Sequence, residues 1–172
     1  MSTKNDERAG DACRIRQVEA RDLDRCYRIE TESYEGDEAA TRDKIRIRIE
    51  TFPQAFLVAE MDGEVAGFIN AGAADVVEME DEAFKELVGH DPDGAHLVIL
   101  SVVVHPDWQG RGLAGALMRA FVERARQWRK TSIQLMCRER HVPLYEKLGY
   151  AYVRPSPSLH GGMAWHEMQL LL

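Results

Sequence analysis

The stretch over residues 97–126 constrains the fold most strongly. It opens with a nearly continuous apolar and β-branched run over 97–104, which is typical of a strand buried on both faces. Pro106 ends that strand, because proline cannot donate to a ladder. Apolar residues then recur from Leu113 onward at spacings of three and four, which predicts a helix. Three glycines mark the passage from the strand to this helix: Gly110 and Gly112 before it and Gly115 in its first turn.

Such a turn has a physical use, because the first amides of a helix have no intrahelical partner and the helix dipole adds partial positive charge. Glycines let the backbone approach a ligand closely, and a phosphate or pyrophosphate is the usual one. Gln109 and Arg111 add donors at the rim. The spacing fits G-x-G-x-x-G, but the Gly-Lys-Ser/Thr ending of a P-loop is absent. A tight turn whose glycines serve geometry alone is the alternative interpretation.

Composition restricts the class of protein. The chain has 172 residues, one domain by the usual size, and a net charge of −7. That charge argues against a nucleic-acid surface and favours cationic small ligands. The sequence has neither an apolar run of membrane-spanning length nor a signal-peptide core, so we expect a cytoplasmic protein without a membrane partner. Its three scattered cysteines predict free thiols in a reducing compartment and no metal site: Cys13, Cys26 and Cys137.

The rest of the chain predicts an α+β protein. We expect residues 1–12 to be disordered and residues 13–172 to form one domain. Asp62-Gly63 between apolar runs predicts a hairpin. An acidic excursion over 76–94 is interpreted either as a solvated face or as a mobile lid that attracts an ammonium group. The predicted strands are 14–18, 55–60, 65–71, 97–104, 132–137, 150–153 and 163–170, and the other predicted helices are 22–34, 39–52 and 142–148.

The run Gln109-Gly110-Arg111-Gly112-Leu113-Ala114 resembles the Gln/Arg-x-x-Gly-x-Gly/Ala signature of the GNAT superfamily of N-acetyltransferases. This resemblance implies the GNAT (acyl-CoA N-acyltransferase) fold, a mixed and mostly antiparallel sheet of about seven strands with a parallel central pair and helices on both faces. It also implies that acetyl-CoA is the co-substrate, with no metal. The residues expected to bind it are Val102, Val103, Val104, Gln109, Gly110, Arg111, Gly112, Leu113, Ala114, Gly115 and Tyr145.

Two further segments resemble particular branches of this superfamily. Residues 135–137 and 142–150 are similar to arylalkylamine (serotonin) N-acetyltransferases, and residues 163–168 look like those of microbial relatives that include polyamine acetyltransferases. Tyr145 matches the family tyrosine near the coenzyme sulfur, so the resemblance implies that its phenol protonates the departing thiolate. A tyrosine that only packs against Tyr150 is the alternative.

The general base is where the sequence departs from this pattern. Vertebrate arylalkylamine enzymes carry a His-x-His pair on the fourth strand, and those positions are Val98 and Leu100 here. His96 lies two residues out of register, and a histidine is suited to the task because it titrates near neutrality. The other candidates are His160, a carboxylate such as Glu32 or Asp37, and a water chain without a dedicated base.

Two residues near the motifs receive other interpretations. His105 is expected to be a surface turn residue before the glycines. Cys137 suggests a covalent acetyl-cysteine, although a cysteine in a buried strand is usually a small hydrophobic residue.

Three functions therefore stay open. The first is acetyl transfer to the primary amine of a small molecule, an arylalkylamine or polyamine, by direct attack in a ternary complex. We expect Tyr34, Phe56 and Trp165 to form the acceptor wall, in a monomer or homodimer. The second is acetylation of a protein or peptide, with the acidic excursion as the docking face. The third is a non-catalytic acyl-CoA-binding module, which the absent His-x-His pair keeps open.

Overall fold

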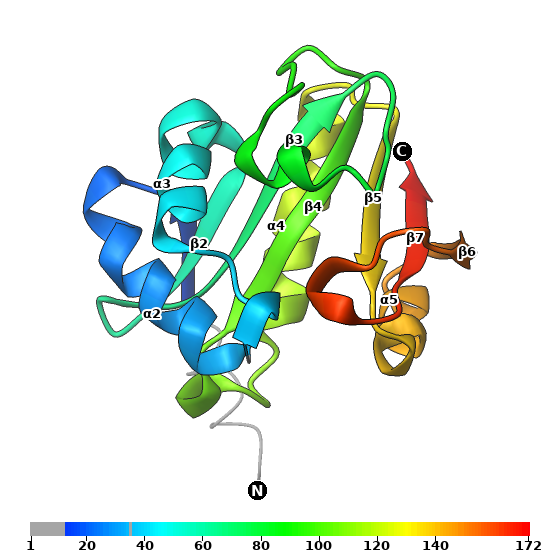
Figure 1. Ribbon diagram of the computed structural model, residues 1–172. Helices are drawn as coiled ribbons and strands as arrows, with labels where there is room; N and C mark the ends of the chain where they lie inside the picture. Colours follow the sequence, from blue (N-terminus) through cyan, green and yellow to red (C-terminus); the bar gives the residue numbers. More distant parts are fainter. Residues whose placement is uncertain (1–12, 35) are drawn as a thin grey trace, which may run out of the picture.

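The computed structural model describes residues 13–34 and 36–172, and the side chain of Asp37 is not described. A seven-stranded sheet runs through this part of the chain in the order β1-β2-β3-β4-β5-β7-β6 (Figure 1). Neighbouring strands are antiparallel except β4 and β5, which are parallel. This is the predicted α+β sheet with its central parallel pair. The strands are β1 (Cys13–Gln17), β2 (Phe56–Met61), β3 (Glu64–Ala74), β4 (His96–Val104), β5 (Ser132–Cys137), β6 (Ala151–Pro155) and β7 (His166–Leu171).

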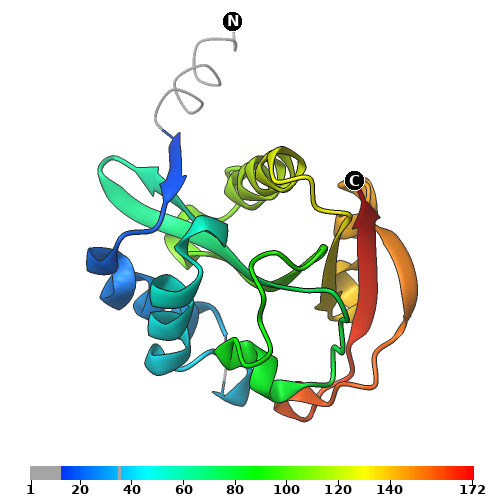
Figure 2. The same cartoon turned by 90° about the horizontal axis from the view of Figure 1, so that it is seen from above.

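The helices lie on both faces of the sheet, as Figure 2 shows. On one face, α2 and α3 pack against β2, β3 and β4. Ile29 of α2 and Ile45 of α3 share this core with Phe68 of β3. On the other face, Leu117 and Phe121 of α4 pack against β2 to β5. The described helices are α2 (Leu23–Ser33), α3 (Arg42–Thr51), α4 (Leu113–Gln127) and α5 (Val142–Lys147), and the short 3₁₀ turns are η1 (Ala20–Asp22), η2 (Gly36–Glu38), η3 (Pro53–Ala55), η4 (Glu82–Glu86), η5 (Pro106–Trp108), η6 (Glu139–His141) and η7 (His160–Gly162).

Local sequence explains several element boundaries. Thr41 caps α3, since its hydroxyl accepts a hydrogen bond from the Lys44 amide at 3.2 Å. Asp62 and Gly63 both have positive φ, 52° and 80°, as a two-residue type I′ hairpin turn requires, so the predicted hairpin is confirmed. The last strand begins at His166 and not at 163, since residues 163–165 form an irregular link between η7, which ends at Gly162, and β7. The prediction for residues 1–12 lies outside the described residues.

The central feature is the separation of β4 from β5 (Figure 1). These strands pair at only three positions, from His96–Ser132 to Val98–Gln134. Just beyond, β4 carries a bulge, because Asn70 of β3 pairs with Ser101 while Ala71 pairs with Ile99. Leu100 is therefore the extra residue, and bulges bend a strand and increase its twist. The two strands diverge from this point and leave a cleft.

Candidate active site

A cavity of about 640 Å³ fills the cleft between β4 and β5. One part is lined by β4, β5, the N-terminus of α4 and α5, and the other by α2, α3, η4 and η7. The second part is called the acceptor end below, and it is the part closed over by residues 74–89. A strand that loses its neighbour exposes one edge and part of its side chains, which explains why Leu100, Val102 and Val104 are half-buried.

The glycine turn lies at the other end of this cavity. Gly110 and Gly112 have φ of 77° and 78°, a conformation that is costly for other residues. The first hydrogen bond of α4 runs from the Ala116 amide to the Gly112 carbonyl, so the amides of Leu113 and Ala114 precede it. Donors and a helix N-terminus thus face the cleft, an arrangement that suits a pyrophosphate.

Most of the predicted coenzyme residues line the cavity, and three do not. The side chain of Val103 points to the opposite face of the sheet and packs with Phe68, because successive strand residues alternate. Arg111 does not line the cavity; its guanidinium lies 4.7 Å from the centre of the ring of Trp108, which does. Gly115 lies within the first turn of α4 and does not line the cavity. The predicted residues that line it are Val102, Val104, Gln109, Gly110, Gly112, Leu113, Ala114 and Tyr145.

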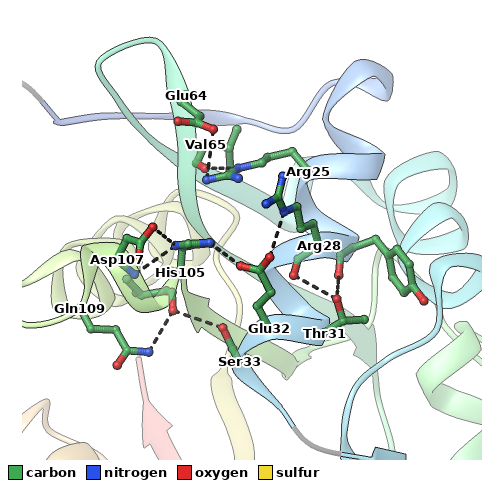
Figure 3. Close-up of polar contacts among 12 residues, drawn as sticks. Arg25, Arg28, Thr31, Glu32, Ser33, Glu64, Val65, His105, Asp107 and Gln109 are labelled. Atoms are coloured by element: carbon green, nitrogen blue, oxygen red, sulfur yellow. Dashed lines mark hydrogen bonds and ion pairs between the residues drawn. The ribbon is translucent and has the colours of Figure 1, made fainter.

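The edge of β4 that faces the cleft has its carbonyls engaged. Tyr34 donates its hydroxyl proton to the Val102 carbonyl at 3.1 Å, and Gln109 donates its amide to the Val104 carbonyl at 3.2 Å. Ser33 also donates to the Val104 carbonyl, at 3.3 Å (Figure 3). In an antiparallel ladder the amide and carbonyl of one residue point to the same side. The amides of Val102 and Val104 therefore face the cleft, where they can polarise a carbonyl oxygen.

Tyr145 lies on α5 at the wall of the same cleft. Burial, and secondarily the neighbouring Cys137 thiol, raises its pKa to about 12, so the phenol keeps its proton at neutral pH. Its ring meets the Tyr150 ring edge-on, with centroids 6.0 Å apart. Tyr145 therefore both packs against Tyr150 and lines the cavity.

The two histidines predicted as bases differ in their place relative to the cavity. His96 does not line the cavity; it lies at the start of β4, at the end remote from the glycine turn, and its Nδ1 is 2.6 Å from Ser132 Oγ. The structure thus does not bring this predicted base to the site. His160 does line the acceptor end, with Nδ1 3.1 Å from a carboxylate oxygen of Glu82 and Nε2 3.4 Å from the Glu38 carbonyl.

The carboxylate candidates also need revision. Glu32 points away from the cavity and pairs with Arg28 at 2.9 Å and with His105 Nε2 at 2.6 Å (Figure 3). The hydrogen bond from Arg28 is the main cause that lowers the pKa of Glu32; desolvation opposes it, and the hydrogen bond from His105 lowers the pKa further. His105 is buried between Glu32 and the Asp107 amide, so the surface assignment was wrong. The Asp37 side chain lies outside the described residues.

Sequence reasoning missed a buried carboxylate, Glu30, at the acceptor end. Its side chain is 1% exposed, and one oxygen accepts from the Ala40 amide at 3.0 Å and from Ser101 Oγ at 3.4 Å. The other oxygen, Oε2, has no hydrogen-bond partner among the described residues. Burial raises the pKa of this carboxyl against the opposing effect of the Ala40 amide and Arg48. A signal existed, since Glu30 follows Cys26 by four residues on the apolar face of the helix.

The remaining predictions concern Cys137 and the aromatic wall. Burial raises the pKa of Cys137 to about 11, and its Sγ lies 3.7 Å from Met168 Sδ, so this thiol resembles a core residue and not an activated nucleophile. Tyr34 and Trp165 line the acceptor end as expected. Phe56 does not, because it is buried against Phe68 in the core that α2 and α3 form with the sheet.

Residues 13–34 and 36–172 contain no cluster of three or more His, Cys, Asp or Glu side chains that could hold a metal ion. Within the same ranges no helix is long and apolar enough to cross a membrane.

A cleft between diverging parallel strands, with a glycine turn at a helix N-terminus, is the arrangement that the resemblance to GNAT acetyltransferases implies. The model of the Acetyltransferase (GNAT) family matches residues 21–150, so the chain belongs to that family. The chain is 33% identical over 104 residues to the acetyltransferase ECA0875 of Pectobacterium atrosepticum, covering 59% of this chain and 60% of the relative. The curated relatives that were compared share between 27% and 60% of their length with the chain.

Solved structures support the same fold. The loading GNATL domain of CurA from Lyngbya majuscula superposes with a TM-score of 0.82 at 15% identity, covering 92% of this chain and 97% of that one. YncA of Salmonella typhimurium, described as a putative acetyltransferase with its cofactor acetyl-CoA, gives 0.68 at 22% identity and covers 94% of each chain.

Proposed function

We propose that the chain transfers an acetyl group from acetyl-CoA to the primary amine of a small molecule. One observation carries this proposal: the cavity joins the glycine turn, the open edge of β4 and the phenol of Tyr145 to an acceptor end containing Glu30 and His160. The turn and the exposed amides suit an acyl-CoA thioester, and the acceptor end holds groups that can take a proton.

Each residue then has a chemical task. The amides before α4 bind the pyrophosphate, and an amide of Val102 or Val104 polarises the thioester carbonyl. The neutral amine attacks the carbonyl carbon, an N–C bond forms, and the C–S bond breaks. Tyr145 donates its phenolic proton to the departing thiolate. The proton that the amine loses goes to a group at the acceptor end.

Two residues are candidates for this base. His160 lies in the cavity wall within hydrogen-bonding distance of Glu82 and Glu38. Glu30 lies beneath the same end and has one oxygen free of partners among the described residues. A carboxyl whose pKa is raised by burial suits a general base better than an ordinary one, because a base works best when its pKa lies near the operating pH.

The segments that meet over the acceptor end support a small-molecule acceptor over a peptide. His160 links η7 to Glu82 of η4 and to Glu38 of η2, so three segments meet over the acceptor end. A peptide needs an open groove across this region, whereas a small amine needs only the cavity.

The proposal is tested by thiol release from acetyl-CoA with four parallel acceptors: phenethylamine, tryptamine, spermidine and a lysine peptide. Turnover of one or more small amines, with little for the peptide, is the expected result. Turnover of the peptide alone would replace the proposal with a peptide acetyltransferase. Acetyl-CoA binding without turnover of any amine would leave only a binding module. His160→Gln and Glu30→Gln, each compared with the exposed control Glu123→Gln, then distinguish the two bases by their loss of kcat.

A further inference from the structure

The acceptor end has positively charged residues that the proposed chemistry does not use. Lys44 and Arg48 of α3 and Lys85 of η4 all line the cavity there. Two carboxylates of the excursion, Glu78 and Asp81, line the cavity as well. All carboxylates of the excursion belong to exposed residues: Glu78, Glu80, Asp81, Glu82, Glu86, Asp91 and Asp93. The acceptor end therefore has a wall of mixed charge, as a zwitterionic ligand requires, and Lys85 is the lysine that the excursion contributes to it.

Lys85 is a largely buried cation whose charge is only partly compensated. Its side chain is only 12% exposed, and its ion-pair partner among the described residues, Glu82, lies at 3.7 Å with half of its own side chain exposed. Burial, opposed by Glu82 and reinforced by Arg48 and Lys44, lowers the pKa of Lys85. A largely buried ammonium is costly when its ion pair is this long, so a further anion beside Lys85 is favourable.

Arg48 adds charge without supplying a counter-ion. Its guanidinium is buried and donates to the Lys85 carbonyl at 3.1 Å, and to Asn70 Oδ1 and Ser101 Oγ at 3.3 Å each. These acceptors are neutral. The carboxylate nearest to this group is Glu30, which reaches it through Ser101. The bond to the Lys85 carbonyl also fixes the backbone that carries the lysine.

Apolar side chains complete the acceptor end. Met79, Phe84 and Val88 of the excursion line the cavity beside Lys85, and Trp165 lines it beside His160. The position of Phe84 is fixed, because its ring packs against Gly72, where even a Cβ would lie 2.7 Å from the ring. The cavity therefore combines a proton acceptor, an apolar wall and a wall of mixed charge.

We propose that the acceptor amine carries a carboxylate, and that it is an amino acid with an apolar side chain. Lys85 and Lys44 bind the carboxylate, the apolar residues of the excursion hold the side chain, and the amino group points toward Glu30, His160 and the open edge of β4. This inference rests on the proposed function, whose chemistry it leaves unchanged. It replaces the arylalkylamine or polyamine as the expected acceptor.

Matched acceptors test it, because phenylalanine differs from phenethylamine, and tryptophan from tryptamine, only by the carboxylate. We expect kcat/KM to be at least tenfold higher for each amino acid than for its amine. A charge-assisted hydrogen bond contributes about 1.5–3 kcal/mol, so Lys85→Met should lower kcat/KM for phenylalanine about 10- to 150-fold more than for phenethylamine. Lys44→Met should act in the same direction, and the exposed Lys147→Met should change neither.

The outcomes separate this inference from the function on which it rests. Preference for the amines, or an equal loss for both acceptors in Lys85→Met, overturns the inference and leaves the acetyltransferase in place. If no acceptor is turned over, the proposed function fails. Calorimetric binding of N-acetylphenylalanine and N-acetylphenethylamine then tests whether the cavity recognises a carboxylate. Binding of only the carboxylate compound, abolished in Lys85→Met, supports the cationic subsite, and equal or absent binding of the two overturns it.

Discussion

Replacing Tyr145 with phenylalanine tests the proposed acid directly, since it removes one oxygen and keeps the ring against Tyr150. The pKa of Tyr145 is about 12, and the neighbouring Cys137 reports what the same surroundings do to a thiol, whose pKa rises to about 11. A thiol in water has a pKa of about 8.5, and proton transfer to its thiolate from this phenol would be uphill by about 5 kcal/mol. Burial in the cleft raises the pKa of a thiol as well as that of the phenol, so a thiolate leaving there accepts the proton more readily than one in water.

We expect Tyr145→Phe to lower kcat by about 10²- to 10⁴-fold, which is about 3–5 kcal/mol of barrier. The assay is thiol release at saturating acetyl-CoA, and Tyr152→Phe, on the exposed strand β6, is the matched control. In the unmodified protein, the loss of kcat caused by Tyr145 ionisation should lie near pH 12, above the working range. The raised pKa also stabilises the fold fully below pH ~10, and this contribution is lost as the pH rises from there toward 12. A kcat within threefold of the unmodified value in Tyr145→Phe would refute the assignment.

Four further substitutions test the geometry around the site. Gly112→Ala should cost about 1–2 kcal/mol because its φ is 78°, and should raise the KM for acetyl-CoA, whereas Gly115→Ala, inside the helix, should raise Tm slightly; thermal unfolding and initial rates distinguish them. Gly72→Ala should destabilise by about 1–3 kcal/mol through its clash with Phe84, seen as a lower urea midpoint. His96→Ala should keep kcat within twofold and lose about 1 kcal/mol of stability, and a large loss of kcat would restore it as a candidate base.

The elements that local patterns define could be predicted from the sequence. The apolar run, proline and glycines of the central stretch specify β4, the turn and α4, because burial, a missing donor and positive φ are properties of single residues and short spacings. The hairpin at Asp62 and Gly63 follows from the same kind of rule. Helix α3 shows the limit, since its isoleucines alternate nearly with period two, yet Ile45 and Ile49 supply a buried face at a spacing of four.

Pairing between strands could not be predicted, and it decides the site. No sequence rule stops the β4–β5 ladder after Val98 or places the extra residue at Leu100. Because the sequence does not give the place of a residue relative to the cleft, His96 and His160 were both candidates for the base. In the structure His96 contacts Ser132 at the start of β4, whereas His160 lines the cavity. Glu30 was missed because a carboxylate on an apolar helix face is ordinarily a solvated residue at its margin.

The separation of β4 from β5 leaves backbone groups of β4 without a strand partner, and side chains replace that partner for the carbonyls but not for the amides. Backbone groups on a buried strand edge need partners, and Tyr34 and Gln109 provide them for the carbonyls of Val102 and Val104. A hydroxyl and an amide group that satisfy acceptors leave the adjacent amides available to a ligand. A ligand that presents carbonyl oxygens to these amides would therefore take the place that β5 leaves. In the proposed mechanism the strand edge offers donors to the thioester carbonyl, and the phenol of Tyr145, in the wall of the same cavity, supplies the proton.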